Sequence, residues 1–341
     1  MKKTPYESYL SGNLVRGCEL CVEGRKMVLF VTGMCSRGCN FCPLSKMRKN
    51  VDDIYANERP VKSIKGLIKE VEVSGAKSCS LTGGDPLLKF DRTMKLAGTL
   101  KKRFGKNFHI HIYLSTKLVN EDKLKRLSKV VDEVRFHPDF DKNQDEELEK
   151  IKLAGKFWKK SNIGVEIPSF PDKTKKMYDF IMKAKDYISF LNLNELEAGE
   201  ILGPLMAKKY SLNKNGYTVK SSVSSGIKLA KRIRKSLPEL NIHMCTSRLK
   251  NWHQYGNRLK NYRIPKFSEM TEDGTIIYFS IEKKNETLLN KEDFIRDNKK
   301  NQIIINPLSV RKIGNGVEIF RVEEYPTYDR EEILREKVQF S

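Results

Sequence analysis

The stretch Met27-Val-Leu-Phe-Val31, followed closely by Cys35-Ser-Arg-Gly-Cys39-Asn-Phe-Cys42, decides how this chain of 341 residues is interpreted. The first part is a short run of apolar residues, which predicts a buried strand. The second part places three cysteines at spacing i, i+4 and i+7, and Gly38 allows the loop that carries them to wrap tightly. We therefore expect three thiols to meet just beyond the end of a strand.

Strands and helices alternate along the chain after this point. Predicted strands span residues 27–31, 78–82, 108–114, 132–136, 163–167, 190–193 and 241–244, and helical patterns occupy 61–75, 87–104, 122–129, 145–160, 173–186, 226–237 and 247–262. This alternation predicts a parallel α/β sheet with helical crossovers. A full or partial (β/α) barrel fits best, and a doubly wound sheet is the alternative. In a barrel, functional side chains gather at the carboxyl ends of the strands.

The pattern divides the chain into three parts. Residues 1–26 form an irregular N-terminal segment, residues 27–263 the barrel, and residues 264–341 a small β-rich C-terminal domain. In the last part we expect strands at 274–283, 302–305 and 316–323, and a charged helix at 330–337. No apolar run is long enough to span a membrane, and the N-terminus lacks the apolar stretch of a signal peptide. We therefore expect a cytoplasmic protein.

The three cysteines of the loop suit an iron–sulfur cluster better than zinc. Thiolates are the ligands that such clusters require, whereas a closed zinc site takes four ligands, and no fourth Cys or His lies near Cys42 in the sequence. Three protein ligands leave one iron of a [4Fe-4S] cluster free to bind a small molecule. The pattern C-x3-C-x-aromatic-C resembles the radical S-adenosylmethionine (SAM) superfamily, including archaeal members related to the pyruvate formate-lyase activating enzyme.

The resemblance implies the chemistry of Cys35, Cys39 and Cys42. They would hold the cluster at which SAM is cleaved to methionine and a 5′-deoxyadenosyl radical, and that radical abstracts a hydrogen atom from the substrate. An external electron donor of the ferredoxin or flavodoxin type is also implied. Gly83-Gly84-Asp85-Pro86, after the second predicted strand, resembles the family's Gly-Gly-Glu motif, whose backbone binds the SAM amino group. Asp85 and Pro86 also suit the start of a helix, and both interpretations hold together.

Polar residues at the ends of the later strands are weaker candidates for contacts with SAM or substrate. Together with the aromatic residue of the motif, the expected cofactor-binding residues outside the Gly-Gly turn are Phe41, Ser115, Thr116, Arg135, Glu166 and Asn194. Any one of them can instead form structural hydrogen bonds. As a set, they are expected to include some contacts with the cofactor.

A second group of cysteines is separated in sequence but close in a barrel. Cys18 and Cys21 precede the first strand, and His243 and Cys245 end the seventh. Because the first and last strands of a closed barrel are neighbours, these residues can converge. With His243 they would form a zinc site, and the three thiols alone would hold an auxiliary iron–sulfur cluster, which we favour. Buried free thiols are the remaining interpretation.

The charge of the chain bears on its partners. The formal net charge is +22, and residues 248–266 interleave basic side chains with Trp252, Tyr255 and Tyr262. Such a surface attracts polyanions, so we expect an enzyme that modifies tRNA or another RNA. The aromatic residues can equally lie on the apolar face of an ordinary helix, and the charge can be a property of a Lys-rich proteome. The alternatives are a radical SAM activase or modifying enzyme acting on a protein or peptide, and a non-catalytic zinc RNA-binding module.

Overall fold

The structure, a computed structural model, describes residues 1–313 and 316–338, which form two β-sheets. The larger sheet contains β1 (Lys2–Lys3), β2 (Tyr9–Ser11), β3 (Lys26–Phe30), β4 (Tyr55–Ala56), β5 (Arg59–Pro60), β6 (Ser78–Thr82), β7 (His109–Ser115), β8 (Glu133–His137), β9 (Ile163–Pro168), β10 (Phe190–Asn194) and β11 (Asn241–Cys245). The smaller sheet contains β12 (Ser268–Met270), β13 (Ile276–Glu282), β14 (Phe294–Asp297), β15 (Gln302–Ile305), β16 (Phe320–Glu324) and β17 (Glu332–Lys337).

Helices connect most of the strands of the larger sheet. The α-helices are α1 (Arg16–Val22), α2 (Ile64–Val73), α3 (Phe90–Phe104), α4 (Glu121–Leu127), α5 (Gln144–Ala154), α6 (Thr174–Ala184), α7 (Gly203–Lys209), α8 (Ser222–Ser236) and α9 (Tyr255–Lys260). A π-helical segment, Leu249–Gln254, leads directly into α9, and short 3-10 helices span Pro86–Lys89, Lys160–Asn162, Lys283–Leu288 and Pro307–Lys312. Within the described residues, no helix is long and apolar enough to cross a membrane.

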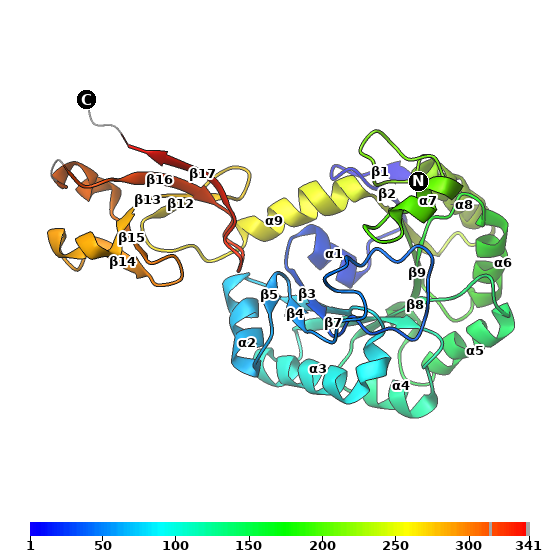
Figure 1. The fold of residues 1–341 in the computed structure, drawn as a ribbon. Coiled ribbons are helices and arrows are strands. Elements are labelled where there is room, and N and C mark those ends of the chain that lie inside the picture. Colours follow the sequence, from blue (N-terminus) through cyan, green and yellow to red (C-terminus); the bar gives the residue numbers. More distant parts are fainter. Residues whose placement is uncertain (314–315, 339–341) are drawn as a thin grey trace.

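The centre of the larger sheet is parallel, as predicted. The strands β3, β6, β7, β8, β9, β10 and β11 lie in that order, each parallel to the next. Figure 1 shows α2 to α6 and α8 on the outer side of this curved sheet. The sheet is open, because β4 pairs with the free edge of β3 and β2 pairs with that of β11. The structure is therefore a partial (β/α) barrel, and the full barrel is excluded because other strands occupy both edges.

Helix α1 lies inside the curve of the sheet (Figure 1). A Cβ atom on Gly17 would lie 2.5 Å from the Arg135 guanidinium and 2.9 Å from the Glu133 carboxylate. Asn192 of β10 donates from Nδ2 to the Sγ atom of Cys18 at 3.3 Å. The expectation that residues 1–26 are irregular is thus wrong. Glycine is required at position 17 by the close approach of α1 to β8.

The smaller sheet is antiparallel and corrects one prediction. The charged helix expected at 330–337 is wrong, because Glu332–Lys337 forms β17 and pairs with β16. Glu332 accepts a hydrogen bond from Lys300 at 2.6 Å, and Arg335 donates to Gln302 at 3.1 Å. These partners lie across the sheet, and their pairing outweighs the helical spacing of the charges.

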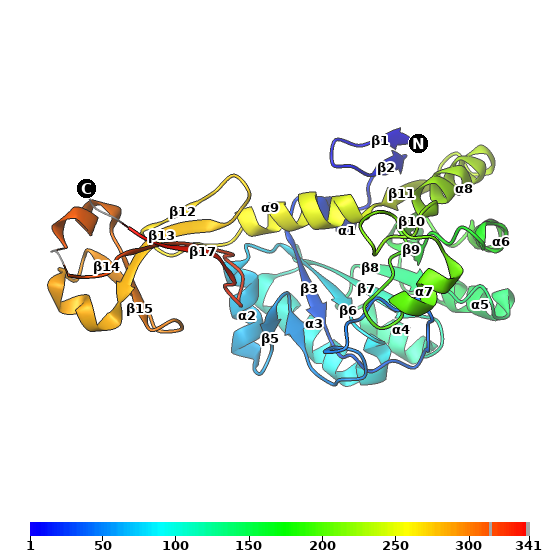
Figure 2. The same ribbon diagram turned by 45° about the horizontal axis from the view of Figure 1, so that its top comes forward.

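The segment that ends in α9 connects the two sheets. Figure 2 shows it running from the larger sheet toward the smaller one. Tyr262 donates to Glu70 of α2 at 2.6 Å, and Arg258 pairs with Glu58 at 2.5 Å. These buried contacts hold the start of the second sheet against the α2 edge of the first.

Candidate active site

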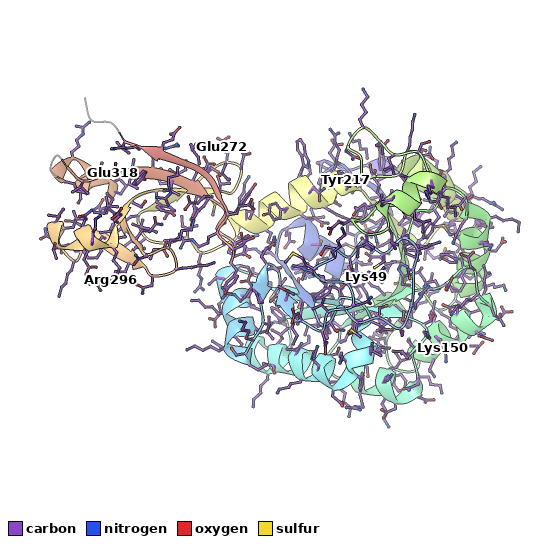
Figure 3. All side chains as sticks on the ribbon, viewed as in Figure 1. Lys49, Lys150, Tyr217, Glu272, Arg296 and Glu318 are labelled. Atoms are coloured by element: carbon purple, nitrogen blue, oxygen red, sulfur yellow. The ribbon has the colours of Figure 1, made fainter. Side chains whose placement is uncertain are left out.

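A cavity of about 560 Å³ lies at the carboxyl ends of the parallel strands. Its wall joins the cysteine loop, the Gly-Gly turn after β6, and the ends of β7, β9 and β10. Of the residues expected from the sequence, those that line it are Cys35, Cys39, Phe41, Cys42, Gly83, Gly84, Pro86, Ser115, Glu166 and Asn194. Figure 3 shows Lys49, another residue of its wall, in the middle of the barrel, and Lys150 near the outer edge.

The cysteine loop is anchored at both of its ends. The backbone N–H of Asn50 donates to the carbonyl of Gly33 at 3.0 Å, which closes the loop. The hydroxyl of Thr32 donates to Asp52 at 2.7 Å, and Arg92 donates to the same carboxylate at 2.6 and 3.1 Å. The three cysteines therefore lie on a loop whose start and end are fixed to the sheet and to α3.

The three thiols fit an iron–sulfur cluster. Burial raises the pKa of Cys35 and of Cys39, and the charge of the neighbouring Cys42 acts in the same direction. All three line the same cavity, and cluster binding would release their protons. Among the described residues, no group of three or more His, Cys, Asp or Glu side chains could hold a metal ion. Three thiols suit a cluster, whose ligands bind separate irons, whereas a closed zinc site takes four ligands.

The Gly-Gly turn is pressed against the start of the cysteine loop. The N–H of Gly84 donates to the carbonyl of Thr32 at 2.7 Å, and that of Asp85 to the carbonyl of Met34 at 2.9 Å. Gly83 has a φ of +136°, and a Cβ atom there would lie 2.3 Å from the Thr32 oxygen. A Cβ atom on Gly84 would lie 2.1 Å from the Met34 oxygen. Only glycine permits this approach, which also leaves the backbone open toward the cavity.

Asp85 is a buried connecting residue. One carboxylate oxygen accepts from the N–H of Leu87 at 3.0 Å and caps the short helix that follows. The other accepts from the hydroxyls of Ser36 at 2.8 Å and Ser115 at 2.7 Å. One side chain thus fixes the cysteine loop, the Gly-Gly turn and the end of β7 relative to one another. Asp85 itself is not part of the cavity wall.

Glu166 brings negative charge to the cavity. Its carboxylate accepts hydrogen bonds from Arg135 at 2.6 Å, Asn192 at 2.9 Å and Asn194 at 3.1 Å. Burial alone would raise the pKa of Glu166, but Arg135 and the two amides lower it to about 2. Arg135 also pairs with Glu133 and does not line the cavity. It therefore positions Glu166 from behind the cavity wall, and the expected contact with the cofactor stays a prediction.

Two other expected site residues are engaged elsewhere. Thr116 is buried and donates its hydroxyl to Glu147, so it does not face the cavity. The Nε2 atom of His243 lies 2.9 Å from the hydroxyl of Ser8, and burial lowers the pKa of this histidine to about 4. The Nε2 atom of His243 is therefore engaged by Ser8, and the expectation that His243 joins the cysteines as a zinc ligand stays a prediction.

The second set of thiols gathers around α1. Cys18 accepts from Asn192 at 3.3 Å, and Cys21 lies three residues further along α1. Burial raises the pKa of Cys245 to about 12, and the charges of Cys21 and Cys18 act in the same direction. Cys245 lies at the end of β11, the strand next to β10, which carries Asn192. None of the three lines the cavity.

Sequence reasoning missed several cavity residues, among them Lys26, Tyr113 and Lys250. Strand alternation could have found two of them, because Lys26 precedes the cavity residue Val28 by two positions and Tyr113 precedes Ser115 by two. Lys250 belongs to the π-helical segment and reaches the cavity only because of tertiary packing. No local pattern in the sequence signals that position.

The basic-aromatic helix predicted over 247–262 is present, but its aromatic residues differ in exposure. Leu249, Leu259 and Tyr262 are buried, as an apolar face requires. Trp252 is 72% exposed, and the guanidinium of Arg248 lies 5.9 Å from its ring centre. Trp252 is therefore a surface residue available to a partner.

Comparison with known proteins adds family relationships to this geometry. The model of the radical SAM superfamily matches residues 29–166. A protein of Methanocaldococcus jannaschii, which carries the provisional name of glycyl-radical enzyme activating enzyme, is 38% identical over 291 residues, which cover 80% of this chain and 75% of that protein. Two solved structures of a radical SAM methyltransferase from Kitasatospora setae align at 10% and 11% identity over 57% of this chain, with TM-scores of 0.37 and 0.36. The chain spans 40% and 41% of those two proteins.

Proposed function

The chain belongs to the radical SAM superfamily, and we propose that it is an activating enzyme that removes a hydrogen atom from a partner protein and leaves a glycyl radical there. The observation that carries the proposal is the 38% identity to the M. jannaschii protein, of which the chain covers 75%. When bound, the [4Fe-4S] cluster supplies the electron that cleaves SAM into methionine and a 5′-deoxyadenosyl radical.

Different residues of the cavity would bind the cluster, bind SAM and hold these binding groups in position. In this proposal the three motif cysteines hold the cluster, and the open backbone at Gly83 and Gly84 binds the ammonium group of SAM. Asp85 keeps these two segments in fixed positions. Glu166 stays ionised at neutral pH because Arg135 holds its pKa low. It therefore offers the cavity negative charge and hydrogen-bond acceptors, which suit the hydroxyls and the cationic sulfonium of SAM.

The proposal is tested by following deuterium into 5′-deoxyadenosine. Extract of the source organism, grown on deuterated amino acids, is treated with protease or with ribonuclease, and the added enzyme is then inhibited. Each portion is incubated anaerobically with the reconstituted chain, SAM and dithionite. We expect deuterated 5′-deoxyadenosine and a glycyl-radical electron paramagnetic resonance signal from the ribonuclease-treated portion only, with the doublet resolved in a parallel sample from unlabelled cells. A Cys35→Ala variant is the control and is expected to form no 5′-deoxyadenosine. Deuterium transfer that survives protease but not ribonuclease would overturn the proposal.

RNA modification is the second candidate, and the distribution of charge favours it. Residues 201–263 carry 14 Lys and Arg against one Asp or Glu, and Trp252 on the same stretch is 72% exposed. Such a surface suits phosphate contacts combined with base stacking. Binding of tRNA that quenches Trp252 fluorescence and weakens steeply with salt would support this candidate. No binding at low salt would remove it.

We also propose that Cys18, Cys21 and Cys245 hold an auxiliary iron–sulfur cluster. Support comes from the donor beside one thiol, because the amide of Asn192 donates to the Sγ atom of Cys18 and can do the same to a metal-bound thiolate. Iron analysis of the Cys35/Cys39/Cys42 triple Ala variant tests the proposal. We expect about eight irons per wild-type chain and about four in the variant. Loss of all iron in the variant would contradict it. Cys79→Ala, which alters a buried thiol in β6, is the matched control and should retain the wild-type iron content.

A further inference from the structure

A second hollow adjoins the first across the cysteine loop. Its volume is about 340 Å³, and its wall includes Lys117, which follows β7, and Lys142, which follows β8. Arg37, Cys39 and His137 line both hollows. The cysteine loop is thus a partition between them, and one expected cluster ligand can be approached from either side.

The charges around the second hollow are not balanced. Two of its cations, Arg37 and Lys173, are neutralised by ion pairs with aspartates. Lys117 and Lys142 are exposed, and neither takes part in an ion pair within the described residues. The Lys117 ammonium donates instead to the backbone carbonyl of Ser36 at 2.6 Å, inside the cysteine loop. The hollow therefore presents net positive charge directly beside the loop.

A separate approach to the cluster is useful while the substrate is bound. A macromolecular substrate that reaches into the first cavity blocks the route through its mouth. The second hollow ends on Arg37 and Cys39, so a partner seated there is adjacent to the cluster but outside the substrate cavity. Unpaired lysines at its edge attract an acidic surface and speed the encounter by charge complementarity.

We propose that this second hollow is the docking site of an acidic one-electron carrier protein of the flavodoxin or ferredoxin class, with Lys117 and Lys142 as the residues that steer it. One electron passes from the reduced carrier to the cluster. The carrier is oxidised by one electron, the cluster is reduced by one, and no covalent bond forms or breaks. The inference rests on the proposed radical chemistry but is independent of whether the substrate is a protein or an RNA.

The test is the rate of cluster reduction without substrate, followed by anaerobic stopped-flow absorbance. Reduced flavodoxin and dithionite are compared as electron sources for the wild type and for Lys117→Glu/Lys142→Glu. At low ionic strength we expect reduction by flavodoxin to slow at least about tenfold in the variant. The difference should shrink in about 0.5 M salt, because salt screens exposed charges. Reduction by dithionite should change less than about twofold.

The matched control is Lys125→Glu/Lys129→Glu, which makes the same charge change on and just after α4, on residues that line neither hollow. Iron content per chain is measured first, so that only equally loaded proteins are compared. An unchanged flavodoxin rate in the variant, or equal slowing by the control, would overturn the docking site. Equal slowing with dithionite would also overturn it, because it would trace the effect to a disturbed loop. Because no substrate is present, this result is separate from the test of glycyl-radical formation.

Discussion

Gly84→Ala is the substitution that tests the geometry of the site most directly. A Cβ atom at this position lies 2.1 Å from the carbonyl oxygen of Met34, whereas ordinary contacts begin at 3.4 Å. The oxygen or the turn therefore has to move by about 1.3 Å, the difference between these distances. Both groups are backbone, and the Met34 oxygen already accepts from the N–H of Asp85. No side-chain rotation can relieve the overlap.

The expected effect has two parts. Overpacking of this kind costs about 1–3 kcal/mol of folding free energy. A displacement of about 1 Å in an active site lowers turnover about 10²-fold. Because Met34 directly precedes Cys35, the displacement acts on the cluster loop itself. We therefore expect SAM cleavage to fall by about 10²-fold while the protein remains folded.

The assay is 5′-deoxyadenosine formed per cluster with dithionite as reductant, together with iron content and the thermal midpoint. Gly98→Ala is the matched control, because it lies in α3 outside the cavity wall and a Cβ atom there meets nothing within 4 Å. It should retain wild-type SAM cleavage. Equal activity of Gly84→Ala and Gly98→Ala would refute the contact between the turn and the loop.

Three further predictions concern the support of the site and its surface. Asp85→Ala leaves three hydrogen-bond donors without an acceptor and should lower the free energy of unfolding in urea by about 3 kcal/mol. Asp85→Asn keeps one acceptor oxygen and should lose less stability, so equal losses in the two variants would contradict the capping role. Hydrogen bonds from Arg92 and a neighbouring lysine hold the pKa of Asp52 well below its usual 3.8. The contribution of Asp52 to folding stability is therefore complete above pH 3.8 and is lost as the pH falls well below that value. Asp52→Asn should therefore lower the free energy of unfolding in urea by about 0.5–1 kcal/mol at pH 7, after allowance for solvent screening. This difference between wild type and variant should shrink as the pH falls, and a difference that stays constant with pH would contradict the prediction. Trp252→Phe should remove most acrylamide-quenchable fluorescence, because the other tryptophan, Trp158, is 7% exposed; quenching that persists would show that Trp158 is accessible.

The parallel strands were predictable because each carries apolar residues that are buried in the core, such as Ile110, Ile112 and Leu114 of β7, and because helical patterns alternate with them. Ser78–Thr82 was predicted with the same bounds as β6. Helix α1 was not predictable, because it is short and because its packing depends on β8 and β10, far along the chain. Strand β17 was taken for a helix because its charges have helical spacing, and only the position of β16 beside it decides otherwise.

The cysteine and glycine motifs of the site were predictable because chemistry restricts the residue types at those positions. The sequence did not predict in which direction the other side chains point or how deeply they are buried. Arg135 points inward like His137 two residues later, but it lies one layer deeper, where α1 and Glu166 cover it. Thr116 follows β7 directly and turns to Glu147 instead of the cavity. Position at the end of a strand does not specify these choices.

The interior placement of α1 has a consequence for synthesis of the protein. The partner of Cys18 on β10, Asn192, lies 174 residues later in the chain. Contacts at such separation form late in folding, and a helix of seven residues is not stable alone. The N-terminal thiols therefore stay open to cellular oxidants until most of the chain has left the ribosome. The yield of active protein should accordingly depend on oxygen exclusion during expression, before any purification step begins.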